Sequence, residues 1–284
     1  MVALTDPDLL FPSEAHSRSL ARDLYAGIKD LPIVSPHGHT DPRLYALNEP
    51  FLDPAQLLIV PDHYIFRMLF SQGVRLEDLG VASLDGAPVE TDGRTIWRRF
   101  AEHYYLFRGT PTRLWLDHVL AHLFGIEEPL NAETADRHYD TIATVLQWEN
   151  FRPRALFERF NIEVIATTEG ALDDLEWHRM IRDSGWEGRV VTAYRPDAVV
   201  DPDFDGFSAN LDRLGEITGC DTGSWAGYLD AHRQRRAFFK SFGATSSDHG
   251  HPTAETANLS DAAAQELFNR IRRGSDDERE RKLF

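Results

Sequence analysis

The chain has 284 residues and a formal charge of −16 at neutral pH, because 46 acidic residues outnumber 30 lysines and arginines. This charge argues against nucleic-acid binding, since phosphate backbones repel a negative protein, and no apolar run reaches the roughly 20 residues of a membrane-spanning helix. The acidic first segment does not look like a secretion signal, and the single Cys220 excludes an internal disulfide, so we expect a cytoplasmic protein.

The amino-terminal segment, residues 6–30, is predicted to be helical because apolar residues such as Leu24 recur every four positions. Asp6 and Ser13 are candidate residues for capping the start of this helix. A Leu-Pro boundary ends the pattern, after which residues 32–36 are apolar and β-branched between two prolines. We therefore expect a helix followed by a short strand.

The predicted strand leads directly into a His-Gly-His motif. His37 and His39 stand two positions apart, so on extended backbone both imidazoles leave the same face. Two neutral imidazoles suit Zn²⁺ or a neighbouring transition metal, although a catalytic site normally needs a third protein ligand and an open position. We predict that His37 and His39 are metal ligands, and the alternative is a pair of solvated loop histidines.

A second candidate group lies in the segment 62–67, where Tyr64 and Arg67 share one side of a helix because they are three positions apart. A phenol can shuttle a proton, and a guanidinium can hold a carboxylate in a bidentate fork. Tyr64 and the adjacent His63 are therefore candidate catalytic residues, and Arg67 is a candidate substrate ligand. The alternative is a helix on which Tyr64 and Phe66 merely pack.

The pattern of the chain changes near residue 160. Residues 40–160 are mostly helical and rich in aromatic side chains, whereas the later β-branched runs at 163–168, 189–194 and 238–247 are predicted strands. Each of these runs ends in polar residues, which suits a parallel sheet with helical crossovers and a site at the strand ends. The expected organisation is a helical segment at 1–30, the first strand and metal motif at 31–39, a helical insertion at 40–160, and βα units at 161–284.

Polar side chains follow the later predicted strands. Arg195 precedes a proline and can serve an anionic substrate, or it can pair with Asp197. Asp248 can orient a histidine or accept a proton, and His249 and His251 stand close to it, so a third metal ligand could come from this group. The alternative for this group is a polar turn.

A helix is expected after the strand at 163–168. Asp173 and Asp174 are predicted to form its acidic first turn, and His178 its exposed face. The sequence contains no glycine-rich dinucleotide fingerprint, no P-loop and no Gly-x-Ser-x-Gly motif, which argues against three common enzyme classes.

Four of these segments, in their order and approximate spacing, resemble the uronate (glucuronate) isomerases of the amidohydrolase superfamily. The segments are 32–39, 62–67, 166–178 and 195–197. The resemblance implies a distorted (β/α)₈ barrel with a helical insertion after its first strand. It also implies interconversion of D-glucuronate with D-fructuronate, and of D-galacturonate with D-tagaturonate.

The resemblance suggests roles for the candidate residues. His37 and His39 are expected to hold a divalent ion, with Zn²⁺ as the first choice. Tyr64 would relay a proton to or from the substrate oxygens, and His63, Arg67 and Arg195 would orient the acid. With Tyr64, the candidate catalytic residues are His63 and Asp248, and His249 is a further candidate substrate ligand. The expected partner is a small hexuronate, and a homo-oligomer is compatible with the sequence.

Two other functions stay open at this point. One is a metal-dependent hydrolase on the same barrel, in which Tyr64 has no role. The other is a non-catalytic binding fragment. Because the chain stops within a charged amphipathic stretch at 278–284 and members of the resembling family are longer, we expect the amino-terminal part of a barrel, with negligible isomerase activity on its own.

Overall fold

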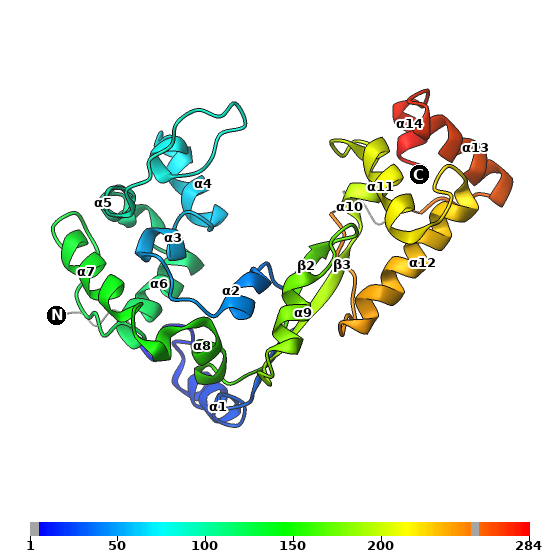
Figure 1. Ribbon diagram of the computed structural model, residues 1–284. Coiled ribbons are helices and arrows are strands. Elements are labelled where there is room, and N and C mark those ends of the chain that lie inside the picture. The colour runs from blue at the N-terminus through cyan, green and yellow to red at the C-terminus, as the bar shows by residue number, and fades with distance from the viewer. Residues whose placement is uncertain (1–5, 251–255) are drawn as a thin grey trace. The chain divides into compact units, whose positions relative to one another are not determined.

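The computed structural model describes residues 6–250 and 256–284 (Figure 1). The chain divides into two compact units, and each is described by itself. The helical unit comprises Met1–Leu31 and Glu49–Leu156, and the sheet unit comprises Pro32–Asn48 and Phe157–Phe284. Within the described ranges, no helix is both long and apolar enough to cross a membrane.

The helical unit is built from short helices. They are α1 (Ala15–Ala26), α3 (Pro54–Leu58), α4 (His63–Ser71), α5 (Gly93–Glu102), α6 (Pro111–His122), α7 (Ala135–Val145) and the start of α8 (Pro153–Arg159). Short 3₁₀ turns, η1 (Glu77–Leu79), η2 (Tyr104–Phe107) and η3 (Glu149–Phe151), lie between them. Aspartate carboxylates accept hydrogen bonds from the first free amides of three helices, namely Asp53 for α3, Asp62 for α4 and Asp92 for α5.

The first helix is shorter than the sequence pattern predicts. It spans Ala15–Ala26, and Glu14 caps it in place of Asp6 or Ser13. The Glu14 carboxylate accepts hydrogen bonds from the amides of His16 and Ser17, at 2.9 and 2.7 Å. The prediction of a helix from residue 6 was wrong because Pro12 has no amide hydrogen and is disfavoured inside a helix.

One apolar core holds the helical unit together. Trp97, Phe100 and Tyr104 lie at its centre, and each is at most 1% exposed. Their polar tips have partners, because the Trp97 indole donates to the Ala135 carbonyl at 2.9 Å and the Tyr104 hydroxyl donates to Asp117 at 2.9 Å. This core therefore combines aromatic packing with satisfied polar groups.

The sheet unit contains three parallel strands in the order β1 (Ile33–Ser35), β2 (Ile162–Gly170) and β3 (Arg189–Arg195). Its helices are α2 (Pro42–Leu47), α9 (Glu176–Asp183), α10 (Asp197–Val200), α11 (Phe207–Thr218), α12 (Trp225–Ser241), α13 (Asp261–Arg272) and α14 (Glu278–Arg281), and α8 ends in it. The strands predicted near residues 32–36, 163–168 and 189–194 are therefore confirmed, and the fold is α/β. Residues 40–48, expected in the insertion, are grouped with these strands.

The strand predicted at 238–247 was wrong. Helix α12 continues to Ser241, because Ala231, Arg235 and Phe239 recur every four positions and all are buried on one face. Phe239 therefore belongs to a buried helical stripe, and the neighbouring Phe238 lies beside it. Only Ser247 pairs with the sheet, through a single parallel bridge to Tyr194 at the end of β3.

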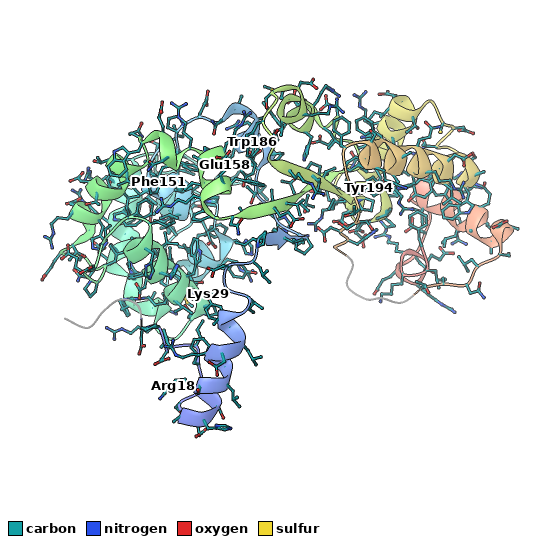
Figure 2. All side chains as sticks on the ribbon, turned by 90° about the horizontal axis from the view of Figure 1, so that it is seen from below. Arg18, Lys29, Phe151, Glu158, Trp186 and Tyr194 are labelled. Atoms are coloured by element: carbon teal, nitrogen blue, oxygen red, sulfur yellow. The ribbon has the colours of Figure 1, made fainter. Side chains whose placement is uncertain are left out.

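Two apolar clusters cover the sheet. One surrounds Tyr194 and Phe239, and the other surrounds Tyr45. In the second cluster Trp186 stacks on Tyr45, with ring centroids 5.8 Å apart, and lies beside Glu158, to which its indole donates at 3.1 Å (Figure 2). These contacts fix the helices against β2 and β3, and so fix the strand ends where polar side chains gather.

Candidate active site

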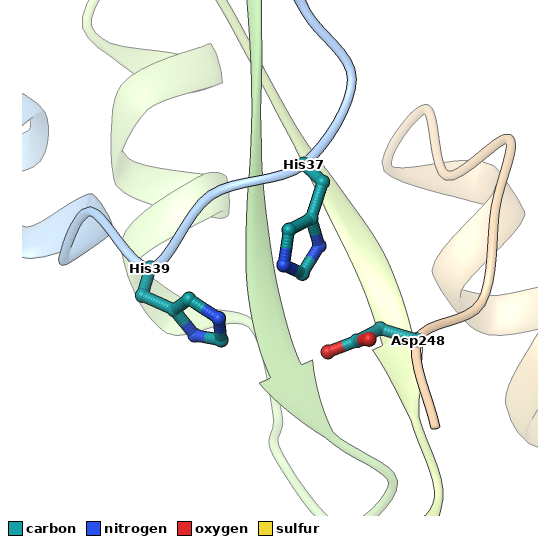
Figure 3. A group of neighbouring side chains, drawn as sticks. All are labelled: His37, His39 and Asp248. Atoms are coloured by element: carbon teal, nitrogen blue, oxygen red, sulfur yellow. The ribbon is translucent and has the colours of Figure 1, made fainter. Parts of the chain in front are cut away.

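Three side chains converge at the ends of the strands in the sheet unit. His37 and His39 come from the loop after β1, and Asp248 follows the bridge residue Ser247 (Figure 3). One ligand atom of each residue lies within 4.8 Å of the others. Two imidazole nitrogens and one carboxylate oxygen form a donor set that fits a divalent transition ion such as Zn²⁺. The two imidazoles are exposed, so such an ion would keep an open position.

Backbone pairing carries Asp248 to this point. The Tyr194 amide donates to the Ser246 carbonyl at 3.2 Å, and the Asp248 amide donates to the Tyr194 carbonyl at 3.0 Å. The segment therefore runs alongside the end of β3 although it forms no full strand. In a parallel sheet all strands end at the same edge, which is why residues so distant in sequence meet the histidines.

Arg195, at the end of β3, is paired with two carboxylates. Its Nε donates to Asp197, and its Nη1 donates to Asp248 at 3.1 Å. The hydrogen bond that Arg195 donates to Asp197 raises the pKa of Arg195 above its ordinary value. The sequence left open whether Arg195 serves a substrate or pairs with Asp197. In the structure Arg195 is paired with Asp197. Only two of the five guanidinium N–H groups are used in these bonds.

The remaining predicted residue of this segment lies at the surface. His249 is exposed, and its Nε2 is 3.2 Å from the Ser247 hydroxyl. His251 lies outside the described residues. The sheet unit thus brings His37, His39, Asp248 and Arg195 together and places His249 next to them in sequence.

His63, Tyr64 and Arg67 form a separate group in the helical unit. As the sequence predicts, they stand at the start of a helix, where the Asp62 carboxylate accepts from the Tyr64 amide at 2.8 Å. Tyr64 is 68% exposed, so it is not packed in the core, and its ring lies 4.3 Å from that of His63. An exposed phenol, imidazole and guanidinium on one helix start are available to a ligand. Their roles in catalysis stay predictions.

Sequence reasoning missed a buried polar network at the end of β2. Glu169, only 7% exposed, accepts hydrogen bonds on Oε2 from the hydroxyls of Thr167, at 2.9 Å, and Thr192. The Thr167 hydroxyl is also 3.0 Å from Nε2 of His178, which lies on α9. Burial raises the pKa of Glu169 to about 7, while the two threonine hydrogen bonds lower it, and the nearby Asp173 raises it further.

The prediction that His178 lies on an exposed helix face was wrong. Helix α9 begins at Glu176 and not at Asp173, and His178 and Ile181, three positions apart on one face of it, are both buried. Burial lowers the pKa of His178, and its Nδ1 has no hydrogen-bond partner in the described part of the chain. The period-two spacing of Thr167 and Glu169 was the one available signal for this network.

A pocket of about 340 Å³ lies between the loops that follow β1 and β2. It is lined by His39, Thr40, Asp41, Pro42, Thr168, Glu169, Gly170, Asp173, Trp177 and His178. Its carboxyl groups would accept hydrogen bonds from hydroxyl groups and would repel an anion. Because His39 also belongs to the metal-ligand group, the pocket and that group adjoin.

Known proteins resemble the whole of this chain. A family model of glucuronate isomerase matches residues 13–283. The chain is 97% identical over 284 residues to a uronate isomerase of Mesorhizobium japonicum and covers 61% of that protein. It is 56% identical over 278 residues, 98% of its own length, to a uronate isomerase of Xanthomonas axonopodis pv. citri and covers 59% of that one. The chain therefore spans less than two thirds of the length of these relatives.

Solved structures of the same kind of protein also match this chain. The crystal structure of glucuronate isomerase from Caulobacter crescentus matches 99% of this chain at a TM-score of 0.95 and 54% identity, and 59% of that chain is covered. A uronate isomerase from Thermotoga maritima, at 24% identity and a TM-score of 0.86, shares the fold over 97% of this chain and 58% of its own. Because the family model matches nearly every residue, this chain belongs to the glucuronate isomerase family.

Proposed function

We propose that the chain is the metal-binding part of a uronate isomerase of the amidohydrolase superfamily. The observation that carries this proposal is the convergence of His37, His39 and Asp248 beside Arg195, in a chain of the glucuronate isomerase family. The proposed reactions are D-glucuronate to D-fructuronate and D-galacturonate to D-tagaturonate, in the cytoplasm. Family membership favours this reading over a hydrolase on the same scaffold.

The proposed architecture is a (β/α)₈ barrel. Three features support it: the strands are parallel, helices connect them, and the candidate site lies at their carboxyl ends, as in known barrels of this type. The outer strand β1 leaves Ile33 and Val34 about half exposed, at 49% and 55%. Further strands of a closed barrel would pair with this edge and cover these side chains.

The proposed metal ligands are His37, His39 and Asp248. When bound, a divalent ion, with Zn²⁺ as the first choice for this donor set, supplies a Lewis acid that polarises the substrate oxygens. Arg195 keeps Asp248 oriented through its hydrogen bond, and its unused N–H groups can hold the substrate carboxylate. Arg67 and His249 are proposed to assist in holding that carboxylate.

The isomerisation requires two proton movements. From aldose to ketose, one proton leaves C2 and one enters C1, while the hydroxyl proton of O2 is exchanged for one on O1. Asp248 is proposed to accept the carbon proton, and Tyr64 to relay the oxygen proton with His63 orienting its phenol. A hydride shift from C2 to C1 is the alternative, and it would carry no solvent deuterium into the product carbon.

The test uses the chain continued through the carboxyl-terminal part of the Mesorhizobium relative, next to the 284-residue chain. We expect the longer protein to form ketose from D-glucuronate in D₂O with deuterium at C1, and His37→Ala to abolish this turnover. Tyr64→Phe should lower kcat much more than it changes KM, because a proton relay acts in the transition state. Absence of ketose with the longer protein would refute the isomerase proposal, and unchanged kcat in Tyr64→Phe would remove Tyr64 from it.

A further inference from the structure

The loop that carries His37 and His39 has little support from strand pairing. Pairing of β1 with β2 ends at Ser35, opposite Ile165, whereas β2 continues to Gly170. Pro36 has no amide hydrogen with which to extend the ladder. Because both imidazoles are exposed, packing does little to orient them. Something other than the sheet must hold this loop if two histidines are to share one ion.

Thr168 on β2 makes the contact that the ladder lacks. Its hydroxyl donates to the Gly38 carbonyl, the peptide group between the two histidines, at 2.9 Å. Ser35 also reaches this loop, but its hydroxyl is 3.5 Å from the His37 carbonyl, the limit of a hydrogen bond. The bond from Thr168 is therefore the stronger of the two side-chain contacts.

The loop lies against β2 at Gly38. A Cβ atom at this position would be 3.4 Å from the Ala166 carbonyl oxygen, which is van der Waals contact distance. On β2, Ala166 and Thr168 share the face that points to the loop, because side chains alternate along a strand. Thr167 and Glu169 occupy the opposite face, where they contact Thr192 and His178.

We propose that Thr168 is a positioning residue for the metal site: by holding the Gly38 carbonyl, its hydroxyl sets both imidazoles at the spacing that one ion requires. The inference rests on the proposed function, because that proposal makes the two histidines ligands. Mutation of a residue that orients a metal ligand typically weakens metal affinity by about 10–100-fold. Thr168→Val keeps the shape and removes the donor, so about tenfold weaker binding is expected.

The experiment measures metal binding and loop mobility on the 284-residue chain without an activity assay. Metal-free protein is titrated with Zn²⁺ by calorimetry and with Co²⁺ by absorption, which reports ligand geometry. Hydrogen–deuterium exchange of the peptide spanning residues 36–40 is followed in the absence of metal. The variants are Thr168→Val, Thr168→Ser, which keeps the hydroxyl, and the matched control Thr167→Val on the opposite face, with His37→Ala as the reference for a lost ligand.

We expect Thr168→Val to weaken Zn²⁺ binding about tenfold, to alter the Co²⁺ spectrum and to speed exchange in residues 36–40. Thr168→Ser should restore all three, and Thr167→Val should lower thermal stability without changing them. Unchanged exchange and affinity in Thr168→Val would overturn the inference while leaving the metal site intact. An equal loss in Thr167→Val would overturn it too, since the effect would then be general destabilisation. A wild-type chain that binds no better than His37→Ala would instead refute the metal assignment, and with it the purpose given to Thr168.

Discussion

The helical unit and the sheet unit bury ionisable side chains in different places. The helical unit has a core around Trp97 and Phe100 and buries His138 on α7, at 1% exposure. The sheet unit buries Glu169, at the end of β2, together with His178, each at most 7% exposed. Burial of apolar area adds stability, but burial of ionisable groups costs free energy unless hydrogen bonds compensate. In the sheet unit this cost of burial falls at the end of β2, in the pocket that Glu169 and His178 share with the candidate metal ligand His39.

The largest effect is expected in the helical core. Trp97→Ala would remove a side chain that is 1% exposed and the hydrogen bond to Ala135, so we expect a loss of about 3–5 kcal/mol in the free energy of unfolding. Trp115→Ala is the matched control, because Trp115 is 46% exposed on another helix of the same unit. Urea unfolding measures both. Similar losses for the two variants would show that burial does not distinguish these positions.

The next effect concerns acid sensitivity of the sheet unit. His232 is buried with Nδ1 2.8 Å from the Tyr194 hydroxyl, and burial lowers its pKa to about 4. As pH falls from 6.5 toward 4, His232 binds a proton in the unfolded chain but stays neutral in the folded chain. The free energy of unfolding therefore decreases, by about 3 kcal/mol at most. His232→Leu should lose less stability than the wild type between pH 6.5 and 4.5. The free energy of unfolding in urea is measured for both proteins at each pH. An equal loss for wild type and His232→Leu between the two pH values would contradict this account.

Glu169 should give a smaller effect on the stability of the sheet unit, with the opposite pH dependence. Its pKa of about 7 means that the folded chain favours the protonated carboxyl, so stability is lost as pH rises from 4.5 through 7. Asp41, Asp173 and His178 face the same pocket. They are present in wild type and in Glu169→Gln, so their own titration largely cancels. We expect the stability of Glu169→Gln relative to wild type to rise by about 2 kcal/mol between pH 5 and 8. Parallel stability curves would rule this out.

The smallest effect is expected at an ion pair on the surface of the helical unit. Arg98 and Asp136 are 2.9 Å apart, and both side chains are half exposed. Exposed pairs contribute little because solvent screens them, so Arg98→Ala should change the free energy of unfolding by less than about 1 kcal/mol. Thermal unfolding at low and high salt would measure it. A loss as large as that of Trp97→Ala would erase the contrast between core and surface.

The sequence predicted the strands that are marked by a pattern of neighbouring residues. Residues 33–35 and 189–195 are β-branched runs bounded by proline or charge, and both are strands. The strand prediction at 238–247 failed because two adjacent apolar residues, Phe238 and Phe239, fit a strand as well as a helix. The four-residue spacing of Ala231, Arg235 and Phe239 was the available signal for a helix, and the packing of Phe239 against Tyr194 shows that this face is the buried one.

The candidate site was partly predictable for the same reason. His37 and His39 stand two apart after a strand, a local pattern, whereas the approach of Asp248 depends on a single bridge beside β3. The network of Glu169 and His178 could not be predicted, because it depends on which face of α9 packs against Thr167. His178 and Ile181 share one face of α9, and only the packing of that face in the folded chain shows that it is buried.

The two faces of β2 also restrict how the length of this strand can vary. Thr168 faces the loop of the metal motif, and Glu169, one position later, faces α9. Deleting one residue between Ile162 and Ala166 would exchange these faces, sending a carboxyl toward Gly38 and leaving a hydroxyl opposite His178. Related chains should therefore accept substitutions in β2 far more readily than insertions or deletions, and single-residue gaps should fall in the turns before Ile162 or after Gly170.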